Sequence, residues 1–336
     1  MIIAVDAMGG DYAPEAIVKG AEIGAIEYGV NVVLVGDENK IKSCMSSKGL
    51  QSELISIQHA SQVVEMGEHA SAIRTKKDAS VVVCANMVKE GKADAMVSVG
   101  NTAAAMGVAT LKLSRIEGID RPAIATIFPG KTGPTVLLDA GAVADCSVDN
   151  MIQFAVMGSS YAEHALGISK PRVGLLSIGE EKSKGNELTR ATHQELLNVP
   201  INFVGNVEGR QILNGIVDVI VADGFAGNVV LKVAEGIYEF IKELVAEELK
   251  KWPLAWLPLA LLYPLLKSLK KKMDYSEYGG APLLGLNGIC IIGHGRSNAK
   301  AVARAIRAAK IAVDGNLVES IRTSIAAIKH PAEINK

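Results

Sequence analysis

The chain has 336 residues, of which 49% are hydrophobic, and its formal net charge is −1. That hydrophobic content is enough for a large buried core, so we expect a globular protein of one large or two medium domains. The near-neutral charge argues against a general nucleic-acid-binding protein, whose surface normally carries a basic excess. The four cysteines form no CxxC pair, and the first residues, MIIAVD, are typical of a strand rather than an export signal, so we expect a cytoplasmic protein.

Short runs rich in Val, Ile and Leu recur along the chain and alternate with segments that have helical spacing. The runs predict buried strands, and the segments between most of them predict helices. Strands with little polar alternation, separated by helices, favour an α/β fold with a mostly parallel sheet covered on both faces. In chain order the expected strands span residues 1–5, 31–36, 53–57, 93–100, 135–141, 172–179, 201–206 and 218–224, and the expected helices span 14–28, 78–90, 101–114, 149–166, 186–197 and 298–313.

Several expected strands run directly into a glycine-containing turn and then into a helix. Such a junction gathers unpaired backbone N–H groups and the positive end of the helix dipole, which favours an anion such as phosphate. The same residues also serve as turns and helix caps without any ligand, and that interpretation stays open at each junction. The candidates in chain order are Asp6, Gly9, Gly10 and Asp11 in DAMGGD; Gly100, Asn101 and Thr102 in SVGNT; Lys184 and Asn186 in KGNE; and His294 and Ser297 in GHGRS.

Residues 217–236, VDVIVADGFAGNVVLKVAEG, form a further junction of this kind. The apolar run breaks at Asp223, turns through Gly227 and Asn228, and resumes with helical spacing through Lys232. Glycine lets the backbone approach a ligand, the Asn228 amide can donate a hydrogen bond, and Lys232 adds a positive charge about one turn into the helix. The junction therefore favours a bound phosphate, while a purely steric reason for the glycines stays open.

Residues 252–266, WPLAWLPLALLYPLL, interrupt the alternating pattern with an uncharged stretch flanked by lysines. A helix of that length would reach only about 22 Å, short of a bilayer core of about 30 Å, and its prolines would interrupt it. We expect a protruding helical hairpin at about residues 229–272 that packs in a dimer interface, contacts a membrane surface, or does both. The residues expected to make those contacts are Trp252, Trp256, Leu257, Leu261 and Leu262.

Other ligand motifs are absent or incomplete. Residues 125–132, ATIFPGKT, resemble the end of a phosphate-binding P-loop, but Ala125 replaces its first glycine and Pro134 prevents the helix that should follow. No GxGxxG or GxSxG motif follows a strand, and the six histidines make no HxxxH or HExxH pair. The sequence therefore predicts neither a nucleotide or other cofactor nor a metal site.

Seven motifs occur in a fixed order: DAMGGD at 6–11, SVGNT at 98–102, RPAIA at 121–125, KGNE at 184–187, DGFAGNVVLK at 223–232, YGGAPLLGL at 278–286 and GHGRS at 293–297. Together they closely resemble the bacterial phosphate acyltransferases that make acyl phosphates from acyl-acyl carrier protein. The resemblance implies a three-layer α/β/α sandwich related to phosphotransacetylases and isocitrate-type dehydrogenases, with residues 1–336 as a single catalytic domain. It also implies a homodimer that acts in phospholipid synthesis.

The reaction implied by the resemblance needs no protein nucleophile. An oxygen of inorganic phosphate attacks the thioester carbonyl and releases the carrier thiol, so the protein must hold phosphate and stabilise an oxyanion. Related phosphotransacetylases have a GN-x-x-x-K element like the one in residues 227–232. The implied phosphate and oxyanion contacts are Lys184, Asn186, Asn228 and Lys232, with Asn101 and Thr102 as further candidates; His294 protonates the thiolate or orients phosphate, and Asp6, Asp11 and Asp223 fix cations and loops.

The implied partners are acyl carrier protein, inorganic phosphate, the membrane surface and a membrane glycerol-3-phosphate acyltransferase. The implied location is the inner face of the cell membrane, with peripheral attachment. Because the carrier is acidic, we expect a basic docking patch, formed by the lysines of residues 267–272 or by Arg304, Arg307 and Lys310.

The chain departs from the family pattern at a few positions. Val143 stands where family members usually have Asn, the loop at 130–134 is shorter than is common, and Arg296 replaces a frequent small residue. Three alternatives remain open: a phosphotransacetylase or phosphotransbutyrylase that uses acyl-coenzyme A, a non-catalytic peripheral membrane scaffold, and a dehydrogenase of the related fold.

Overall fold

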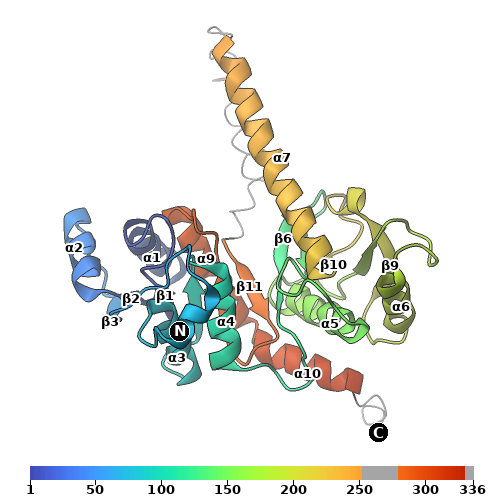
Figure 1. Cartoon of the computed structure of the whole chain (residues 1–336), viewed down its shortest axis with the longest axis horizontal. Helices are drawn as coiled ribbons and strands as arrows, with labels where there is room; N and C mark the ends of the chain where they lie inside the picture. The colour runs from blue at the N-terminus through green and yellow to red at the C-terminus, as the bar shows by residue number, and fades with distance from the viewer. Residues whose placement is uncertain (252–278, 330–336) are drawn as a thin grey trace.

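The computed structural model describes residues 1–251 and 279–329, which form two α/β lobes and a long helix that stands between them (Figure 1). Each lobe has its own sheet, one of seven strands and one of five. The first lobe contains β1 (Ile2–Asp6), α1 (Glu15–Tyr28), β2 (Asn31–Gly36), α2 (Glu38–Lys48), β3 (Ile55–His59), η1 (Ala70–Arg74), α3 (Ser80–Lys89), β4 (Ala95–Ser98), α4 (Thr102–Leu113), β5 (Ala123–Ile124), β11 (Ala281–Leu284), β12 (Ile289–Ile292) and α9 (Ala299–Asp314).

The first sheet has the strand order β3-β2-β1-β4-β12-β11-β5, and only β11 runs antiparallel to its neighbours. Side chains alternate across the sheet, as the pleat requires. Ile3 and Val5 of β1 belong to a buried cluster that includes Ile17 of α1 and Val302 of α9. Ala4 between them belongs to another cluster with α3 and α4. The sheet is therefore the middle layer of an α/β/α sandwich.

The second lobe contains β6 (Thr126–Pro129), β7 (Pro134–Leu138), α5 (Val148–His164), β8 (Val173–Ser177), α6 (Glu187–Leu196), β9 (Phe203–Glu208), η2 (Gly209–Gln211) and β10 (Val219–Val221). Its sheet has the order β6-β7-β10-β8-β9, in which only β6 is antiparallel. One face packs on α5 and α6, and α10 (Leu317–Lys329) packs on α5. On the other face, Leu137 and Ile220 pack with Phe128 and with the base of α7 (Gly224–Lys251).

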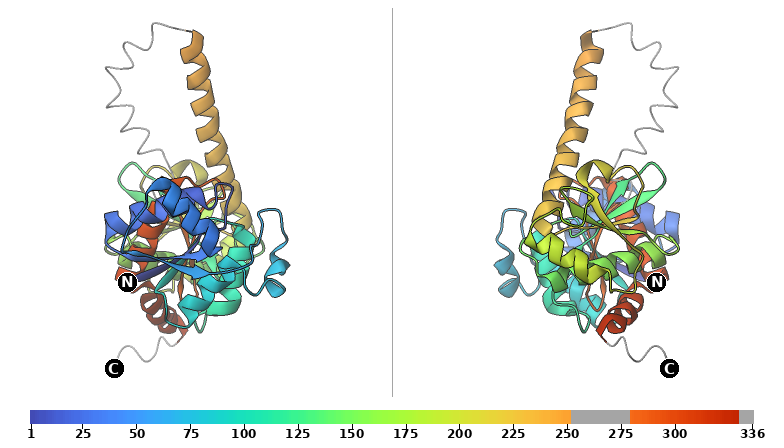
Figure 2. Two further views of the ribbon diagram at one scale, coloured as in Figure 1. Left: turned by 90° about the vertical axis from the view of Figure 1, so that its left-hand side faces the viewer. Right: turned by 90° about the vertical axis from the view of Figure 1, so that its right-hand side faces the viewer.

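The chain passes between the lobes several times. It crosses at Ala125, whose N–H donates to the carbonyl of Pro282 at 3.0 Å, and leaves the second lobe through α7, which rises away from the body (Figures 1 and 2). It then returns to the first lobe, where β12 lies between β4 and β11. Finally α10 packs on α5 of the second lobe, where the hydroxyls of Ser160 and Ser324 are 2.9 Å apart. The two lobes are thus tied together at the β5–β6 crossing and by α10.

The predicted α/β class with mostly parallel strands is confirmed, and every expected strand and helix overlaps an observed one. The strands divide between two sheets, whereas the sequence suggested one. Four short strands were missed, β5, β6, β11 and β12. Of these, β12 is an apolar run, ICII, between Gly288 and Gly293, and so carried the signal by which other strands were recognised. Helix α2 was also missed, since Ile41 and Cys44 are its only buried residues.

Candidate active site

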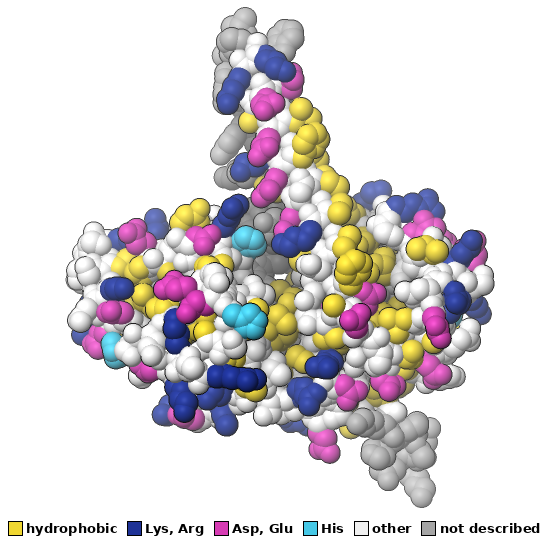
Figure 3. Space-filling model, viewed as in Figure 1, with side chains coloured by type: hydrophobic (Ala, Val, Ile, Leu, Met, Phe, Trp, Pro, Cys, Tyr) yellow, Lys and Arg dark blue, Asp and Glu magenta, His cyan; other side chains and the backbone are white. Residues whose placement is uncertain are grey.

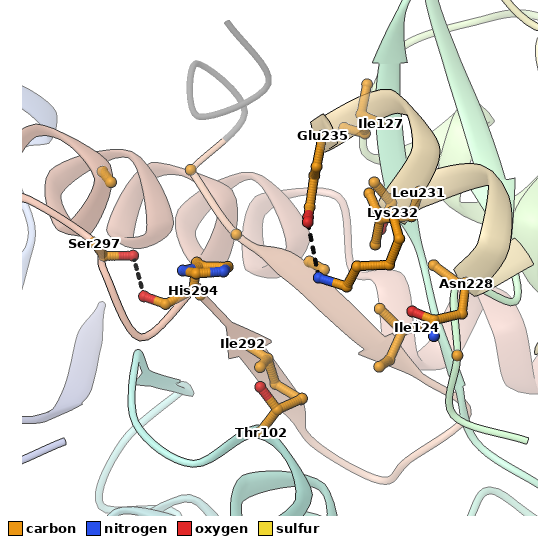
Figure 4. Close-up of a pocket in the computed structure, with 18 residues that line it drawn as sticks. Thr102, Ile124, Ile127, Asn228, Leu231, Lys232, Glu235, Ile292, His294 and Ser297 are labelled. Atoms are coloured by element: carbon orange, nitrogen blue, oxygen red, sulfur yellow. Dashed lines mark hydrogen bonds and ion pairs between the residues drawn. The ribbon is translucent and has the colours of Figure 1, made fainter. Parts of the chain in front are cut away.

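A cavity of about 320 Å³, the interlobe cavity, opens between the lobes at the base of α7 (Figures 3 and 4). Its wall comes from the start of α4 and the β12–α9 connection on one side, and from β6, the β7–α5 connection and α7 on the other. The residues predicted from the sequence that line it are Thr102, Asn228, Lys232, His294 and Ser297. Residues more than 190 positions apart in the sequence therefore meet in one space.

The start of α7 differs from the turn expected there. The helix begins at Gly224, and the Asp223 carboxylate caps it by accepting a hydrogen bond from the N–H of Ala226 at 2.8 Å. Gly227 is therefore part of the first helical turn, not of a turn before the helix. A Cβ on Gly227 would lie 1.8 Å from the carbonyl oxygen of Asp139, so glycine is needed for α7 to pack on the end of β7.

Asn228 and Lys232 lie one turn apart on the face of α7 that borders the cavity (Figure 4). Lys232 Nζ lies 2.8 Å from Oε2 of Glu235, a cavity residue that the sequence analysis missed. The Lys232 side chain is 57% exposed and that of Glu235 only 19%, so the ammonium group remains open to solvent. An anion that enters the cavity must compete with Glu235 for this ammonium group. The three-residue spacing on a helix was the available signal for the pair.

The buried carboxylate of Asp139 organises the loop after β7. It accepts hydrogen bonds from the N–H groups of Ile124 at 2.9 Å and Val143 at 2.8 Å. Burial raises the pKa of Asp139, and its backbone donors oppose that rise. Val143 acts here through its backbone, because its carbonyl also accepts from Gly224 N–H at 2.9 Å. Asp139 was missed in the sequence, although it follows an apolar run in the same way as Asp6, which was singled out.

His294 enters the cavity from the β12–α9 connection. Its Nδ1 accepts a hydrogen bond from Arg296 N–H at 3.1 Å, which assigns the hydrogen of the neutral ring to Nε2. Ser297 Oγ donates to the His294 carbonyl at 2.6 Å and so stabilises the loop. The imidazole and the Lys232 side chain point from opposite lobes into the same space (Figure 4). His294 can therefore donate a hydrogen bond to a group bound beside Lys232.

The β1–α1 junction supports the cavity from behind. Asp6 is buried and accepts hydrogen bonds from Ser80 Oγ at 2.6 Å and from Ser98 Oγ at 2.8 Å. Burial raises the pKa of Asp6, and these hydrogen bonds oppose the rise. A Cβ on Gly9 would lie 2.9 Å from Cα of Gly100, so the two glycines allow the β1–α1 and β4–α4 loops to touch. These residues hold together the loops next to the cavity and do not line it.

Gly10 and Asp11 connect the same layer to the loop of His294. Asp11 N–H donates to the carbonyl of Gly295 at 2.8 Å. Gly10 has a φ of 102° and lies close to Val99, where a Cβ would be 2.9 Å from the carbonyl oxygen. The β1–α1, β4–α4 and β12–α9 connections of the first lobe therefore contact one another.

Asn101 is used entirely within the protein. Its Oδ1 accepts from Ala104 N–H at 3.0 Å, which caps α4, and its Nδ2 lies 2.8–3.2 Å from the carbonyls of Glu65, Met66 and Glu68. The next residue, Thr102, is the first of α4 and lines the cavity. The helix start therefore reaches the site through Thr102, while Asn101 anchors the neighbouring loop.

Lys184 and Asn186 lie on the β8–α6 connection and do not line the interlobe cavity. Asn186 caps α6 by accepting a hydrogen bond from Thr189 N–H at 2.8 Å. The backbone N–H of Lys184 donates to the carbonyl of Glu181 at 3.0 Å. A contact between either side chain and phosphate stays a prediction.

Two surface predictions have different outcomes. The hairpin residues Trp252, Trp256, Leu257, Leu261 and Leu262 lie outside the described residues. Arg304 was expected in a basic docking patch, but it is only 9% exposed, so that expectation was wrong. Gly279 packs closely against the backbone and Cβ of Arg304. Lys310 forms an ion pair with Asp314, while Arg307 is exposed. Within residues 1–251 and 279–329 no helix has the length and apolar character needed to span a bilayer.

The chemistry of the interlobe cavity suits an anionic ligand. Thr102 at the start of α4, and Ser297 and Ala301 at the start of α9, line it, so the positive ends of these two helices lie at the cavity. Lys232 adds a full positive charge, and Asn228 and His294 add hydrogen-bond donors. In the described part of the chain, no cluster of His, Cys, Asp or Glu is arranged to hold a metal ion.

Known proteins resemble this chain over nearly its whole length. The profile of a family described as fatty acid synthesis protein matches residues 1–320. A phosphate acyltransferase of Pelotomaculum thermopropionicum is 52% identical over 330 residues, which cover 98% of this chain and 96% of that protein. One of Desulfitobacterium hafniense is 51% identical over 327 residues, covering 97% of this chain and 98% of that protein.

A solved phosphotransacetylase from Streptococcus pyogenes shares the fold, with a TM-score of 0.62. The alignment covers 93% of this chain and 94% of that structure, at 16% sequence identity. The expected relation to the phosphotransacetylase fold is thereby confirmed.

Proposed function

Because this chain belongs to the fatty acid synthesis protein family and is an acyltransferase, we propose that it transfers a fatty acyl group from acyl-acyl carrier protein to inorganic phosphate. The product is an acyl phosphate, a precursor for phospholipid synthesis. The observation that carries the proposal is the meeting of Asn228 and Lys232 from one lobe with His294 from the other. These groups supply the cation and donors that phosphate and a developing oxyanion require.

In the proposed reaction, phosphate binds near the starts of α4 and α9. It replaces Glu235 as the ion-pair partner of the Lys232 ammonium group. One phosphate oxygen forms a bond to the thioester carbonyl carbon, and the carbonyl oxygen becomes an oxyanion. Asn228 Nδ2 and His294 Nε2–H donate hydrogen bonds to the phosphate and to this oxyanion. The carbon–sulfur bond then breaks, and the thiolate takes the proton carried by the attacking hydrogen phosphate, which the Nε2–H of His294 orients. The products are acyl phosphate and the carrier thiol.

The direct test is release of the carrier thiol from palmitoyl-acyl carrier protein with and without inorganic phosphate. We expect release that depends on phosphate and falls about a hundredfold or more in Lys232→Ala. Lys242→Ala, on the exposed part of α7, is the matched control and should retain wild-type turnover. Thiol release that is independent of phosphate would exclude the proposed reaction.

The main alternative is a phosphotransacetylase that uses a coenzyme A thioester. It remains a candidate because a solved phosphotransacetylase has the same fold. Turnover of palmitoyl-acyl carrier protein, palmitoyl-coenzyme A and acetyl-coenzyme A distinguishes the two functions. A clear preference for acetyl-coenzyme A would favour the alternative.

The proposed partners are those that the family resemblance implies. We propose that the chain forms a homodimer in the cytoplasm and contacts the inner membrane surface through residues 252–266, which follow the end of α7. Replacing Trp256, Leu257 and Leu261 with polar residues should abolish liposome binding while the dimer persists. Liposome binding that survives these changes would rule out this membrane contact.

For the carrier protein, charge reversal at residues 270–272 should weaken its binding, and the loss should be largest at low salt.

A further inference from the structure

A second cavity of about 660 Å³ continues from the interlobe cavity along α7. This space, the apolar groove, is bounded by the β6 segment at 126–131, by the η2 segment at 209–213 and by residues 229–241 of α7. The two cavities are adjacent because they share four wall residues, which are Thr126, Ile127, Leu231 and Glu235.

The floor of the groove is buried and its sides are open. Phe128 and Ile212 are 6% and 4% exposed, so the floor is part of the packed second lobe. Leu213, Val233 and Ile237 on the sides are 51%, 55% and 53% exposed. A row of half-exposed apolar side chains above a buried apolar floor favours a hydrocarbon ligand over water.

Two neighbouring faces of α7 border the two cavities. Asn228 and Lys232 face the interlobe cavity, whereas Val229, Val233 and Ile237 face the apolar groove. The charged side chains on the groove wall are Lys131, on the β6–β7 turn, and Glu235, at the boundary with the interlobe cavity. The wall therefore changes from polar to apolar within about one helical turn.

We propose that the apolar groove binds the hydrocarbon chain of a long-chain acyl donor while the thioester carbonyl lies in the interlobe cavity. This inference rests on the proposed function. The groove follows α7 for about 18 Å between residues 229 and 241, at 1.5 Å per residue. Its volume is in the usual range for pockets that enclose a ligand. An acetyl group would leave this length empty, whereas each methylene buried there strengthens binding by about fourfold.

The matched variants Val233→Phe and Val245→Phe test this assignment. Both valines are on α7 and have similar exposure, 55% and 51%, but only Val233 lines the groove. In Val233→Phe the larger side chain narrows the groove without adding polarity. We expect the ratio of kcat/KM for palmitoyl over butyryl thioesters to fall at least about tenfold in Val233→Phe and to stay near wild type in Val245→Phe.

Binding of cis-parinaric acid, a fluorescent fatty acid, gives a readout that does not depend on catalysis. Weaker probe binding to Val233→Phe than to Val245→Phe supports the assignment of the groove. Absence of phosphate-dependent cleavage in the wild type would remove the proposed function but would leave this binding result in place. Equal selectivity and equal probe binding in the two variants would overturn the assignment. It would also be overturned if Val233→Phe alone changed the oligomeric state in sedimentation and lost selectivity only as subunits dissociated, because the groove would then be an interface between copies.

Discussion

The β4–α4 and β10–α7 junctions place an Asn in similar sequence contexts but use it differently. Asn101 is the cap of α4, and both polar atoms of its side chain bond within the protein. Asn228 lies inside the first turns of α7, where Asp223 already supplies the cap, and its side chain lines the interlobe cavity. The position relative to the helix start therefore decides whether the amide supports the fold or faces a ligand. Substitutions at the two junctions should separate activity from stability.

Asn228→Ala should have the largest effect. Loss of one preorganised donor to the phosphate or oxyanion is expected to lower kcat/KM by about a hundredfold to a thousandfold, with little change in unfolding free energy. Steady-state kinetics and urea unfolding of the same preparation check this. A variant with normal turnover and reduced stability would show that Asn228 is a structural residue like Asn101.

Gly227→Ala should mainly lower stability. The added Cβ would lie 1.8 Å from the Asp139 carbonyl oxygen, so α7 must shift away from β7, at a cost of about 3 kcal/mol. Gly236→Ala is the control on the same helix, because a Cβ there meets nothing within 4 Å and should stabilise the helix by about 0.5–1 kcal/mol. Equal unfolding free energies for the two variants would contradict the packing argument.

Asn101→Ala should cost about 1–2 kcal/mol of unfolding free energy through the lost cap and the lost carbonyl contacts. Asn101→Asp keeps the cap acceptor but turns a carboxylate oxygen towards the three carbonyls, so it should destabilise through the Nδ2 position alone. Both variants should keep kcat within a fewfold of wild type. A much larger loss of turnover at unchanged stability would place Asn101 in the reaction after all.

The smallest effect is expected on the reactivity of two buried thiols, those of Cys146 and Cys84. Burial raises the pKa of Cys146, near Gly224, to about 11, and that of the fully buried Cys84, near Asp6, well above its ordinary value. A raised thiol pKa lowers the thiolate fraction, to roughly one part in a thousand for Cys146 at about pH 8. Modification of these two thiols by a disulfide reagent should therefore be slow in the folded protein. Gly227→Ala should accelerate it at Cys146 and Asn101→Ala at Cys84; fast labelling of the wild type would contradict both.

The sequence predicted the long elements well and the packing between them poorly. Continuous apolar runs such as residues 31–36 and helical spacing such as that of residues 149–166 are strong local signals, and these elements were found. The division into two sheets depends on the partners of the short strand β5 and of the late strands β11 and β12, and this pairing has no local signal. Long-range pairing decides their place, and a single sequence does not contain it directly.

The same limit applies to the candidate site. Chain chemistry singled out Lys232 and His294, and the structure brings them to one cavity. It also singled out Asp6 and Asn101, because a capping or buried polar residue has the same sequence signature as a ligand-binding one. Glu235 was missed since its role depends on which face of α7 meets the cavity.

The position of β12 bears on how the protein is made. This strand lies in the interior of the first sheet, between β4 and β11, although it is close to the C-terminal end of the sequence. Strands β1 to β4 therefore leave the ribosome long before the strand that completes their sheet, and the exposed edge of β4 must wait while the whole second lobe is synthesised. A nascent chain halted before Ile289 should hold an incomplete first lobe with an open edge, which chaperones bind and proteases cleave.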